Sequence, residues 1–434
     1  MAFGYCSTAS CGGRIRIALR ELAIPADSEY AERTSSRVVL GAAANIPYLM
    51  RAIGHGAFLD AHSHPADCGV SPSKTDELAA SHQFESIQGP APGSLLVRTI
   101  HSPDGDIWAG VHTGSGCTEP VSRILVHGKD GLDVLIPTNW PHSAFVSLEM
   151  DRRTALCLGN GRLARLRALT IGIIGIGGVG SMVARLLAGL VGKLILVDGD
   201  RIEAHNAPRV WFAGARCQGI KVERAKRALR SAFPHLSVRA LPEFFPSLGS
   251  LRELATADLL FVCPDHNSVR FSASCFAAEH FIPLIEVGCG GRAGGNAITA
   301  LGHHVRLQLP RPESPCLCCN GLDLTKLEDP ETTRWKKRVG YVEGGGEIEG
   351  ELAPLTTRAA ADAVDVFLRY CTGFPGKPPL HLYCDSVNMK TLDLSGSYTA
   401  IPRCPRCGDG REQPDLIQEA GEPMILSDGD LSAE

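Results

Sequence analysis

The chain has 434 residues and a formal net charge of −4, with 44% hydrophobic and 21% charged residues. At ~150 residues per domain this length predicts two or three domains, and the apolar content excludes wholesale disorder. Because the chain has no basic excess and only 6% aromatic residues, we expect no nucleic-acid partner.

The N-terminus and the cysteines predict a cytoplasmic protein with no membrane partner. Met1 is followed by Ala-Phe-Gly-Tyr, which lacks the basic segment and cleavage site of a signal peptide. The longest uncharged stretch, residues 168–184, contains five glycines, so we interpret it as a strand, a turn and a helix rather than a membrane span. In a reducing compartment, the C-x-x-C pairs among the 16 cysteines are expected to bind metal rather than to form disulfides.

Residues 1–145 predict a small α+β domain. Apolar and basic residues alternate from 14 to 20, which indicates a half-exposed strand. Residues 43–54 have a helical pattern, and residues 57–61 predict a short strand. Further strands, separated by Pro, Gly and Asp turns, are expected at 94–100, 105–112 and 122–127.

Two histidines after the short strand predict a metal site. His62 and His64 are two residues apart, so on an extended chain their side chains point the same way. Asp76 lies in the first turn of a helix that Ser73 caps, and it can supply a third ligand. An open fourth position would hold water, as in catalytic zinc sites. An ordinary histidine-rich turn is the alternative interpretation.

This H-x-H-P…S-x-x-D pattern resembles the motif of the JAMM (JAB/MPN) metallopeptidases, which cleave isopeptide or peptide bonds at ubiquitin-like C-termini. The resemblance covers roughly residues 1–130 and implies a JAMM/MPN-like domain. It makes His62, His64 and Asp76 the zinc ligands and Ser73 the serine that stabilises the oxyanion. The gap from His64 to Asp76 has 11 residues, one more than the common eukaryotic spacing.

The predicted peptidase lacks its general base. A zinc peptidase needs a group that takes a proton from the attacking water, and in the family this is a glutamate just before an early strand. Here that strand is expected at residues 2–6, and Glu21, Glu29 and Glu32 lie beyond it. Either the natural start lies upstream or the domain has lost the base. The chain as written is expected to bind zinc and to cleave weakly, and an upstream extension bearing a glutamate should raise cleavage.

From residue 169 the pattern changes to alternating buried-type strands and helices, which predicts a Rossmann-like, doubly wound α/β domain with a parallel sheet. Residues 146–167 are expected to be a link, and residues 356–371 a long helix. The strands are expected at 169–175, 194–198, 258–263 and 282–287, and the helices at 178–190, 219–232 and 267–280. Residues 412–434 carry seven acidic and no basic residues, which predicts a disordered tail.

A glycine-rich turn predicts a nucleotide site at the start of this domain. Four glycines form G-x-G-G-x-G between a strand and a helix: Gly175, Gly177, Gly178 and Gly180. The helix N-terminus offers N–H groups to phosphate. Asp198 follows at the end of the next strand, where a carboxylate can accept from ribose hydroxyls, and Asp200 lies two residues on. The alternatives are an ordinary tight turn and a solvated acidic loop.

A polar set after this turn favours a triphosphate over a dinucleotide. Its members are Asn206, Arg209, Lys221, Asp265 and Arg270. Arg209 and Lys221 can neutralise phosphates, and Asp265 can hold Mg²⁺. An NAD-dependent oxidoreductase, the competing enzyme class, would leave these side chains idle.

The ordered set resembles the ThiF/MoeB/HesA family, adenylating relatives of the ubiquitin-activating enzymes. Residues 197–209 match its D-x-D…N-x-x-R stretch, and residues 265–270 match its D-x-x-x-x-R. Residues 218–221 resemble the G-x-x-K region with the glycine displaced by one, and residues 151–159 resemble the opening D-R-Q…G. The resemblance implies a ThiF-type adenylating domain over residues 146–411.

In this family the substrate is the C-terminal carboxylate of a ubiquitin-like or sulfur-carrier protein, usually ending in Gly-Gly. The carboxylate attacks the α-phosphate of Mg·ATP and gives an acyl-adenylate and pyrophosphate. The resemblance implies a homodimer in which Arg152 reaches the ATP of the neighbouring subunit. It places Asp198 at the ribose, Asp200 beside it in the nucleotide site, Asn206, Arg209 and Lys221 at the phosphates, and Asp265 at Mg²⁺.

Two C-x-x-C pairs predict a structural zinc site, Cys316/Cys319 and Cys404/Cys407. Four thiolates suit tetrahedral Zn²⁺, and the family carries such a four-cysteine site in the same order. Cys318, inside the first pair, makes the choice of ligands ambiguous. Unpaired buried thiols are the alternative.

The cysteine spacing favours adenylation without a thioester. Residues 320–370, where the crossover loop of full ubiquitin-activating enzymes would lie, contain no cysteine. The remaining candidates for a thioester are Cys217, Cys263, Cys289 and Cys371.

Together, the two resemblances predict a bacterial enzyme that activates a ubiquitin-like tail in one domain and trims or releases the same tail in the other. Both protein conjugation and sulfur transfer are compatible with this combination. Other hypotheses are adenylation with a catalytically dead docking domain, a non-enzymatic carrier-binding scaffold, and a tRNA-modifying adenylase, which should carry a basic surface that the composition does not show.

Overall fold

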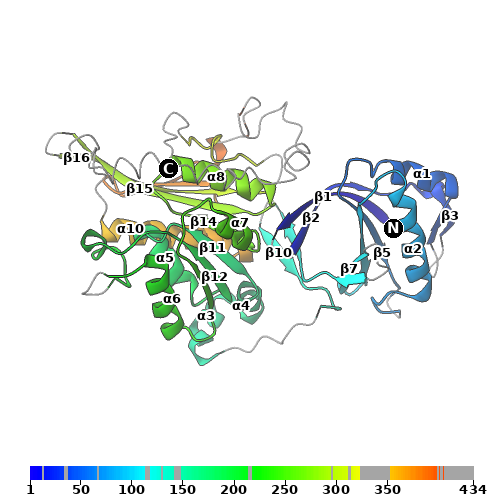
Figure 1. Ribbon diagram of the computed structural model, residues 1–434, viewed down its shortest axis with the longest axis horizontal. Helices are drawn as coiled ribbons and strands as arrows, with labels where there is room; N and C mark the ends of the chain where they lie inside the picture. Colours follow the sequence, from blue (N-terminus) through cyan, green and yellow to red (C-terminus); the bar gives the residue numbers. More distant parts are fainter. Residues whose placement is uncertain are drawn as a thin grey trace, which may run out of the picture. The chain divides into compact units, whose positions relative to one another are not determined.

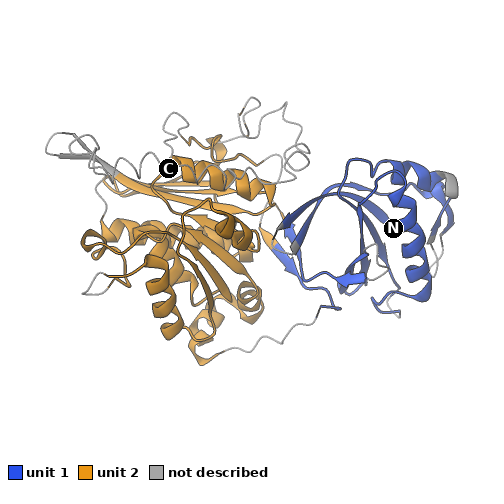
Figure 2. Ribbon diagram, viewed as in Figure 1, with its two compact units in different colours: residues 1–126, 133–145 blue, residues 127–132, 146–434 orange. Residues whose placement is uncertain are grey.

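The computed structural model divides the chain into two compact units (Figure 2). The described residues are 1–11, 14–33, 38–65, 68–112, 118–128, 131–140, 148–213, 218–294, 297–310, 314–322, 352–397, 400 and 404. The first unit comprises residues 1–126 and 133–145, and the second comprises residues 127–132 and 146–434. Among the described helices, none is both long and apolar enough to cross a membrane.

The first unit contains a six-stranded sheet in the order β2-β1-β5-β6-β7-β8 (Figure 1). The strands are β1 (Ala2–Cys11), β2 (Arg14–Ala23), β5 (Ala57–Ser63), β6 (Leu95–His101), β7 (Ile107–His112) and β8 (Thr118–Pro120). β5 and β6 run parallel, and the other neighbours run antiparallel. The other elements are α1 (Ala42–Met50), α2 (Lys74–Gln88) and the pair β3 (Tyr30–Arg33) with β4 (Val38–Leu40). The pair β9 (Ile124–His127) with β10 (Leu132–Leu135) lies mostly in this unit, but His127 and Leu132 belong to the second.

The core of the first unit fixes the start of α2. Phe3 of β1 stacks on Phe58 of β5 at 5.4 Å between ring centroids, and both are buried. Ala80 and Ile87 of α2 belong to the same apolar cluster. Because α2 is the crossover between the parallel strands β5 and β6, its N-terminus follows the carboxyl end of β5, where His62 lies.

The second unit is a Rossmann-like α/β domain on an eight-stranded sheet in the order β13-β12-β11-β14-β15-β16-β17-β18 (Figure 1). The first five strands are parallel and the last three join antiparallel. The strands are β11 (Thr170–Ile174), β12 (Lys193–Val197), β13 (Ser237–Leu241), β14 (Leu259–Val262), β15 (Leu284–Gly294), β16 (Ala297–Gln308), β17 (His381–Asp385) and β18 (Lys390–Asp393). In this doubly wound order, ligands bind beyond the carboxyl ends of the strands where the order reverses, here between β11 and β14.

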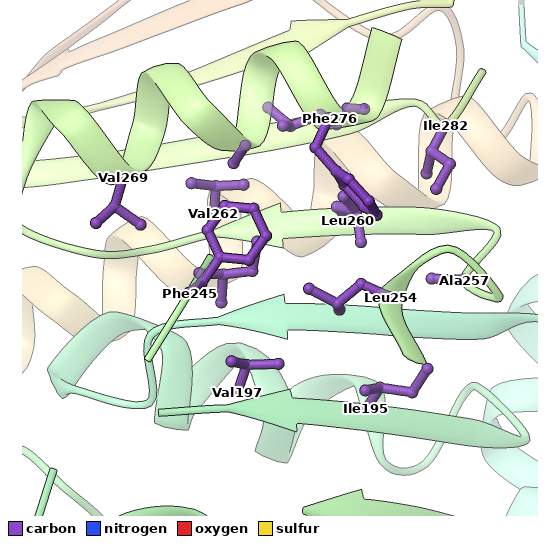
Figure 3. Packing of buried hydrophobic residues seen from close by; sticks show 14 of the residues in the cluster. Ile195, Val197, Phe245, Leu254, Ala257, Leu260, Val262, Val269, Phe276 and Ile282 are labelled. Carbon is purple, nitrogen blue, oxygen red and sulfur yellow. The ribbon is translucent and has the colours of Figure 1, made fainter. Parts of the chain in front are cut away.

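Helices cover both faces of the parallel sheet. They are α3 (Arg152–Leu158), α4 (Asn160–Arg167), α5 (Gly178–Leu187), α6 (Lys221–Ala232), α7 (Leu248–Leu254), α8 (Asn267–Glu279) and α10 (Ala353–Thr372). On one face, Leu254 of α7 and Phe276 of α8 pack over Leu260 of β14 (Figure 3). On the other face, Phe261 of β14 lies 5.9 Å from Phe367 of α10, between ring centroids. This double burial explains why the central parallel strands β11 and β14 are fully buried apolar runs.

The fold contains elements that the sequence analysis did not predict, among them β13 and α7. Residues 146–167, expected as a link, contain α3 and α4, because Leu163 and Leu166 are both fully buried despite the arginines around them. The antiparallel strands β16, β17 and β18 were not predicted. The acidic tail 412–434 and Cys407 lie outside the described residues.

Candidate functional site

The glycine turn after β11 has a backbone that larger residues cannot adopt. Gly175 has φ +85°, and a Cβ there would lie 3.0 Å from the Pro264 nitrogen in the loop after β14. A Cβ on Gly180 would lie 1.9 Å from the Gly175 carbonyl oxygen. The turn therefore brings the N-terminus of α5 close to the loop after β14, with its N–H groups available to an anion.

Asp198, at the end of β12, braces this turn. Its Oδ2 accepts from the Ile176 N–H at 2.7 Å, and its Oδ1 accepts from the Asp200 N–H at 2.8 Å. Burial raises the pKa of Asp198, although Lys221 opposes the shift. Each carboxylate oxygen has a second lone pair, so the same side chain can still accept from a ribose hydroxyl.

Lys221, the first residue of α6, is a buried cation next to these aspartates. Its Nζ lies 2.8 Å from Asp200 Oδ2 and 3.8 Å from Asp198 Oδ2. Burial alone would lower the pKa of Lys221, but Asp198, Asp200 and Asp265 together outweigh burial and raise it. The amine is therefore held in the charged state that binding of a phosphate requires.

The structure places the other predicted nucleotide ligands as follows. Asn206 is buried in a short turn, where its Oδ1 accepts from the Glu203 N–H at 3.0 Å, and Arg209 follows it. The Asp265 side chain, just after β14, is 83% exposed. Arg152 is exposed at the start of α3 and pairs with Glu149 at 3.9 Å; among the described residues no contact joins it to the other predicted ligands.

Arg270 and Glu286 form a part of the site that sequence reasoning underestimated. Arg270, the last residue of the D-x-x-x-x-R motif, donates from Nε to the Pro264 carbonyl at 3.1 Å and lies 3.2 Å from Glu286 Oε1. Glu286 is fully buried in β15. The available signal was an acidic residue inside the apolar run Leu284–Val287, which demands a buried partner.

Three of the four predicted cysteine ligands meet in a buried cluster. The Sγ of Cys316 lies 3.8 Å from that of Cys319 and 3.6 Å from that of Cys404. These separations are too long for a disulfide of ~2.05 Å. They match the ~3.8 Å that tetrahedral geometry gives for Zn–S bonds of ~2.3 Å, so the donor set fits Zn²⁺. Cys318 is only half-buried.

Two of the four remaining cysteines, Cys263 and Cys371, are poor candidates for a thioester. Burial raises the pKa of both Cys263 and Cys371, which disfavours the nucleophilic thiolate. Cys289 lies in β15, and Cys217 lies outside the described residues.

His62, His64 and Asp76 also converge, in the first unit. Asp76 Oδ1 lies 3.4 Å from His62 Nε2, and Asp76 Oδ2 lies 3.3 Å from His64 Nε2. The opposite ring nitrogen of His64 lies 3.0 Å from the Gly69 carbonyl, and that of His62 lies 3.8 Å from Asp60 Oδ1. Both rings therefore present Nε2 to one point and Nδ1 to an oxygen, as metal-bound histidines do.

Two further observations fit a cation at this point. His62 Nε2 is buried without a hydrogen-bond partner among the described residues. Burial raises the pKa of Asp76, but hydrogen bonds from Ser73 and the nearby His62 and His64 give a net lowering. Ser73 caps α2 as predicted: its Oγ accepts from the Asp76 N–H at 3.2 Å, and its own N–H donates to Asp76 Oδ2 at 2.6 Å. The donor set suits Zn²⁺.

Two of the early glutamates have partners elsewhere. Glu21 pairs with Arg51, and Glu29 accepts from the Tyr48 hydroxyl at 2.9 Å. Neither of these contacts involves the histidine cluster.

Comparisons with known proteins find similar families, sequences and structures for the second unit. A model described as the ThiF family matches residues 151–404. The chain is 30% identical over 169 residues to ubiquitin-like modifier-activating enzyme 5 of Xenopus laevis, and 29% identical over 168 residues to that of Gallus gallus. Each match covers 36% of this chain and 40% of the relative, so the chain spans about 40% of the length of these relatives. A crystal structure of E. coli MccB with succinimide gives a TM-score of 0.48 at 20% identity, over 60% of this chain and 75% of that one.

Proposed function

The chain belongs to the ThiF family, and from this premise we propose that its second unit adenylates the C-terminal carboxylate of a ubiquitin-like or sulfur-carrier protein. The names of the relatives in Xenopus laevis and Gallus gallus support a ubiquitin-like protein tail as the substrate. We propose that this tail ends in Gly-Gly, as the resemblance to the family implies.

The observation that carries this proposal is the convergence of charged groups beyond the carboxyl ends of three parallel strands. The glycine turn follows β11, Asp198 and Asp200 follow β12, and Asp265 follows β14, with Lys221 paired to the first two. We assign the triphosphate to the α5 N-terminus, Asn206, Arg209 and Lys221, and the ribose to Asp198. A dinucleotide would need no such cluster of cations.

The proposed reaction is a displacement at phosphorus. A carboxylate oxygen of the tail attacks the α-phosphorus of ATP, the bond from that phosphorus to the bridging oxygen breaks, and pyrophosphate leaves. Asp265 is exposed and would hold Mg²⁺, which neutralises charge on the departing pyrophosphate. Lys221 would exchange its ion pair with Asp200 for one with a phosphate and stabilise the transition state by charge.

The test is exchange of labelled pyrophosphate into ATP in the presence of a Gly-Gly-ending carrier. We expect Lys221→Ala to lower the exchange rate by ~100-fold or more, the effect of removing one transition-state contact. Lys226→Ala, on the same helix, should leave it unchanged. If the unaltered chain shows no exchange with any carrier but reduces NAD, the oxidoreductase alternative is correct.

We also propose a homodimer in which Arg152 acts on the ATP of the partner subunit. Each site would then combine Lys221 of one protomer with Arg152 of the other. Arg152→Ala and Lys221→Ala should each be inactive alone, whereas equal mixing should restore about a quarter of the exchange activity, because about half of the dimers are then mixed and each mixed dimer contains one intact site. Two variants that stay inactive after subunit exchange would contradict the shared site.

A second candidate function is favoured by the His62–His64–Asp76 geometry in the first unit. The JAMM likeness of this unit stays a prediction, under which the three side chains would hold Zn²⁺ and the ion would activate a water to trim or release the same tail. Ser73 would stabilise the oxyanion. Elemental analysis should give about two zinc ions per chain, and His62→Ala/His64→Ala should lose one; a carrier extended beyond its Gly-Gly should be cleaved only by the two-zinc form.

A further inference from the structure

Glu286 is a buried anion on which two arginines, Arg306 and Arg270, and one histidine, His304, converge. Its carboxylate lies 2.7 Å from Arg306 Nε, 3.1 Å from His304 Nε2 and 3.2 Å from Arg270 Nε. Burial raises the pKa of Glu286, but these neighbours hold it well below its usual range. A buried charge is retained only when it is paired and hydrogen-bonded, so the four side chains form one connected network.

One branch of the network reaches the proposed nucleotide site at the carboxyl ends of β11, β12 and β14, here called the nucleotide-binding edge. Arg270 lies in the first turn of α8 and donates to the Pro264 carbonyl at 3.1 Å and to Asn267 Oδ1 at 3.4 Å. Pro264 precedes Asp265, and its nitrogen borders the glycine turn, 3.0 Å from a Cβ on Gly175. The position of the loop that carries the proposed Mg²⁺ ligand therefore depends on where Glu286 holds Arg270.

The other branch reaches the cysteine cluster. Arg306 Nη1 donates to the Asn320 carbonyl at 2.9 Å. Asn320 follows Cys319, and its own N–H donates to the Cys316 carbonyl at 3.0 Å, which closes the turn between the two thiols. Arg306 is 4% exposed and Asn320 is 1% exposed, so water does not compete for this contact.

We propose that Glu286 is a positioning residue that couples the cysteine cluster to the nucleotide-binding edge. It touches no reacting atom and acts through Arg270 on one side and Arg306 on the other. The inference rests on the adenylation proposed above, because ATP must occupy that edge for the coupling to matter. ATP that orders the 263–265 loop should, through the same contacts, hold the turn between Cys316 and Cys319 more firmly. By reciprocity, zinc bound at the cysteines should strengthen ATP binding by the same factor.

The test measures zinc release to a colorimetric chelator, with and without Mg·ATP. The full chain carries His62→Ala and His64→Ala, so that the histidine cluster of the first unit contributes no released zinc, and zinc that a Cys316→Ser chain no longer releases is assigned to the cysteine cluster. We expect ATP to slow release by about 5-fold or more, the lower end of typical coupling. Glu286→Gln in the same chain should abolish the ATP effect and lower the exchange kcat by ~10- to 100-fold while changing KM for ATP little.

His303→Gln is the matched control. His303 is the neighbour of His304 on β16 and is more deeply buried, and its Nε2 bonds Asp362 at 2.7 Å. The His303→Gln chain should keep the ATP effect on zinc release. If general damage to β16 were enough to abolish that effect, the His303→Gln chain would lose it too. If Glu286→Gln does not fold, Arg306→Lys replaces it, because lysine keeps the charge beside Glu286 and lacks the second N–H group that reaches Asn320.

The outcomes separate the two proposals. A chain that binds ATP while zinc release ignores ATP, or a Glu286→Gln or Arg306→Lys chain that keeps the full ATP effect, overturns the coupling and leaves adenylation intact. A chain that purifies without zinc overturns the coupling as well. A chain that does not bind ATP at all, measured by calorimetry, overturns the adenylation proposal and the coupling with it.

Discussion

At the scale of single residues, the glycine turn shows how closely backbone atoms pack at the nucleotide-binding edge. Gly177 and Gly180 both belong to the motif, yet their surroundings differ. A Cβ on Gly177 meets nothing within 4 Å, whereas a Cβ on Gly180 would overlap the Gly175 carbonyl at 1.9 Å. The motif alone does not distinguish these positions, because it records residue type and not the distance to the opposite backbone.

Gly180→Ala should therefore destabilise the turn by ~1–3 kcal/mol, the usual cost of overpacking, and weaken ATP binding. Gly177→Ala, whose Cβ would meet nothing within 4 Å, should leave the unfolding temperature close to unchanged. Thermal unfolding and calorimetric titration with ATP check the pair. Equal effects of the two substitutions would contradict the steric account.

His381 is a second residue whose surroundings give a testable expectation. Burial, together with His304 and Arg306, lowers its pKa from 6.5 to about 4. Between the unfolded pKa of 6.5 and the folded pKa of about 4, the His381 ring is protonated in the unfolded chain and neutral in the folded chain. The free energy of unfolding should therefore fall as the pH drops from about 6.5 toward 4. His381→Gln should make this fall smaller, and His205→Gln, at an exposed position, should not; urea unfolding at pH 7 and pH 4.5 measures both.

At the scale of elements, the cysteine turn is part of the hydrophobic core. Leu317 and Leu322 belong to the cluster that includes Leu254, Leu260 and Phe276. The thiols that flank Leu317 therefore fix the position of a core side chain between α8 and the sheet. A metal bound there would support the packing of the whole α7–α8 face.

Removal of the metal should consequently loosen this face. A strong chelator should lower the unfolding temperature of the unaltered chain by several degrees, in proportion to the lost binding free energy. Cys316→Ser should start from the lower temperature and show no further shift. Cys371→Ser, at a buried cysteine outside the cluster, should respond to the chelator like the unaltered chain; the opposite pattern would place the metal elsewhere.

At the scale of the whole molecule, the sequence predicts the elements that have a local pattern and misses those that depend on pairing between residues far apart in the chain. The strands β11, β12 and β14 are confirmed because double burial makes each one a continuous apolar run. β17 and β18 were missed, because β18 is exposed and its register depends on β17, and β17 pairs with the distant β16. The network around Glu286 was missed for the same reason: its members lie in three elements, and no fixed spacing relates them.

The segment 127–132 gives an expectation at this scale, since it belongs to the second unit. His127 Nδ1 lies 2.6 Å from the hydroxyl of the buried Tyr370, and a Cβ on Gly131 would lie 2.9 Å from the Tyr370 carbonyl oxygen. A fragment of residues 146–434 should therefore be ~1 kcal/mol less stable than the same unit with 127–132 retained, the worth of one hydrogen bond. Urea unfolding monitored by circular dichroism compares them, and equal midpoints would show that the segment contributes nothing.

The assignment of residues 127–132 to the second unit also bears on how the two units could be inherited. The chain passes from the first unit into the second at residue 127, returns at 133 and passes over again at 146. A single recombination event between genes would leave one product without its own piece of the second unit. The two units are therefore interleaved along the chain rather than consecutive, and a lineage in which one unit lost its function would be expected to keep the fold of that unit.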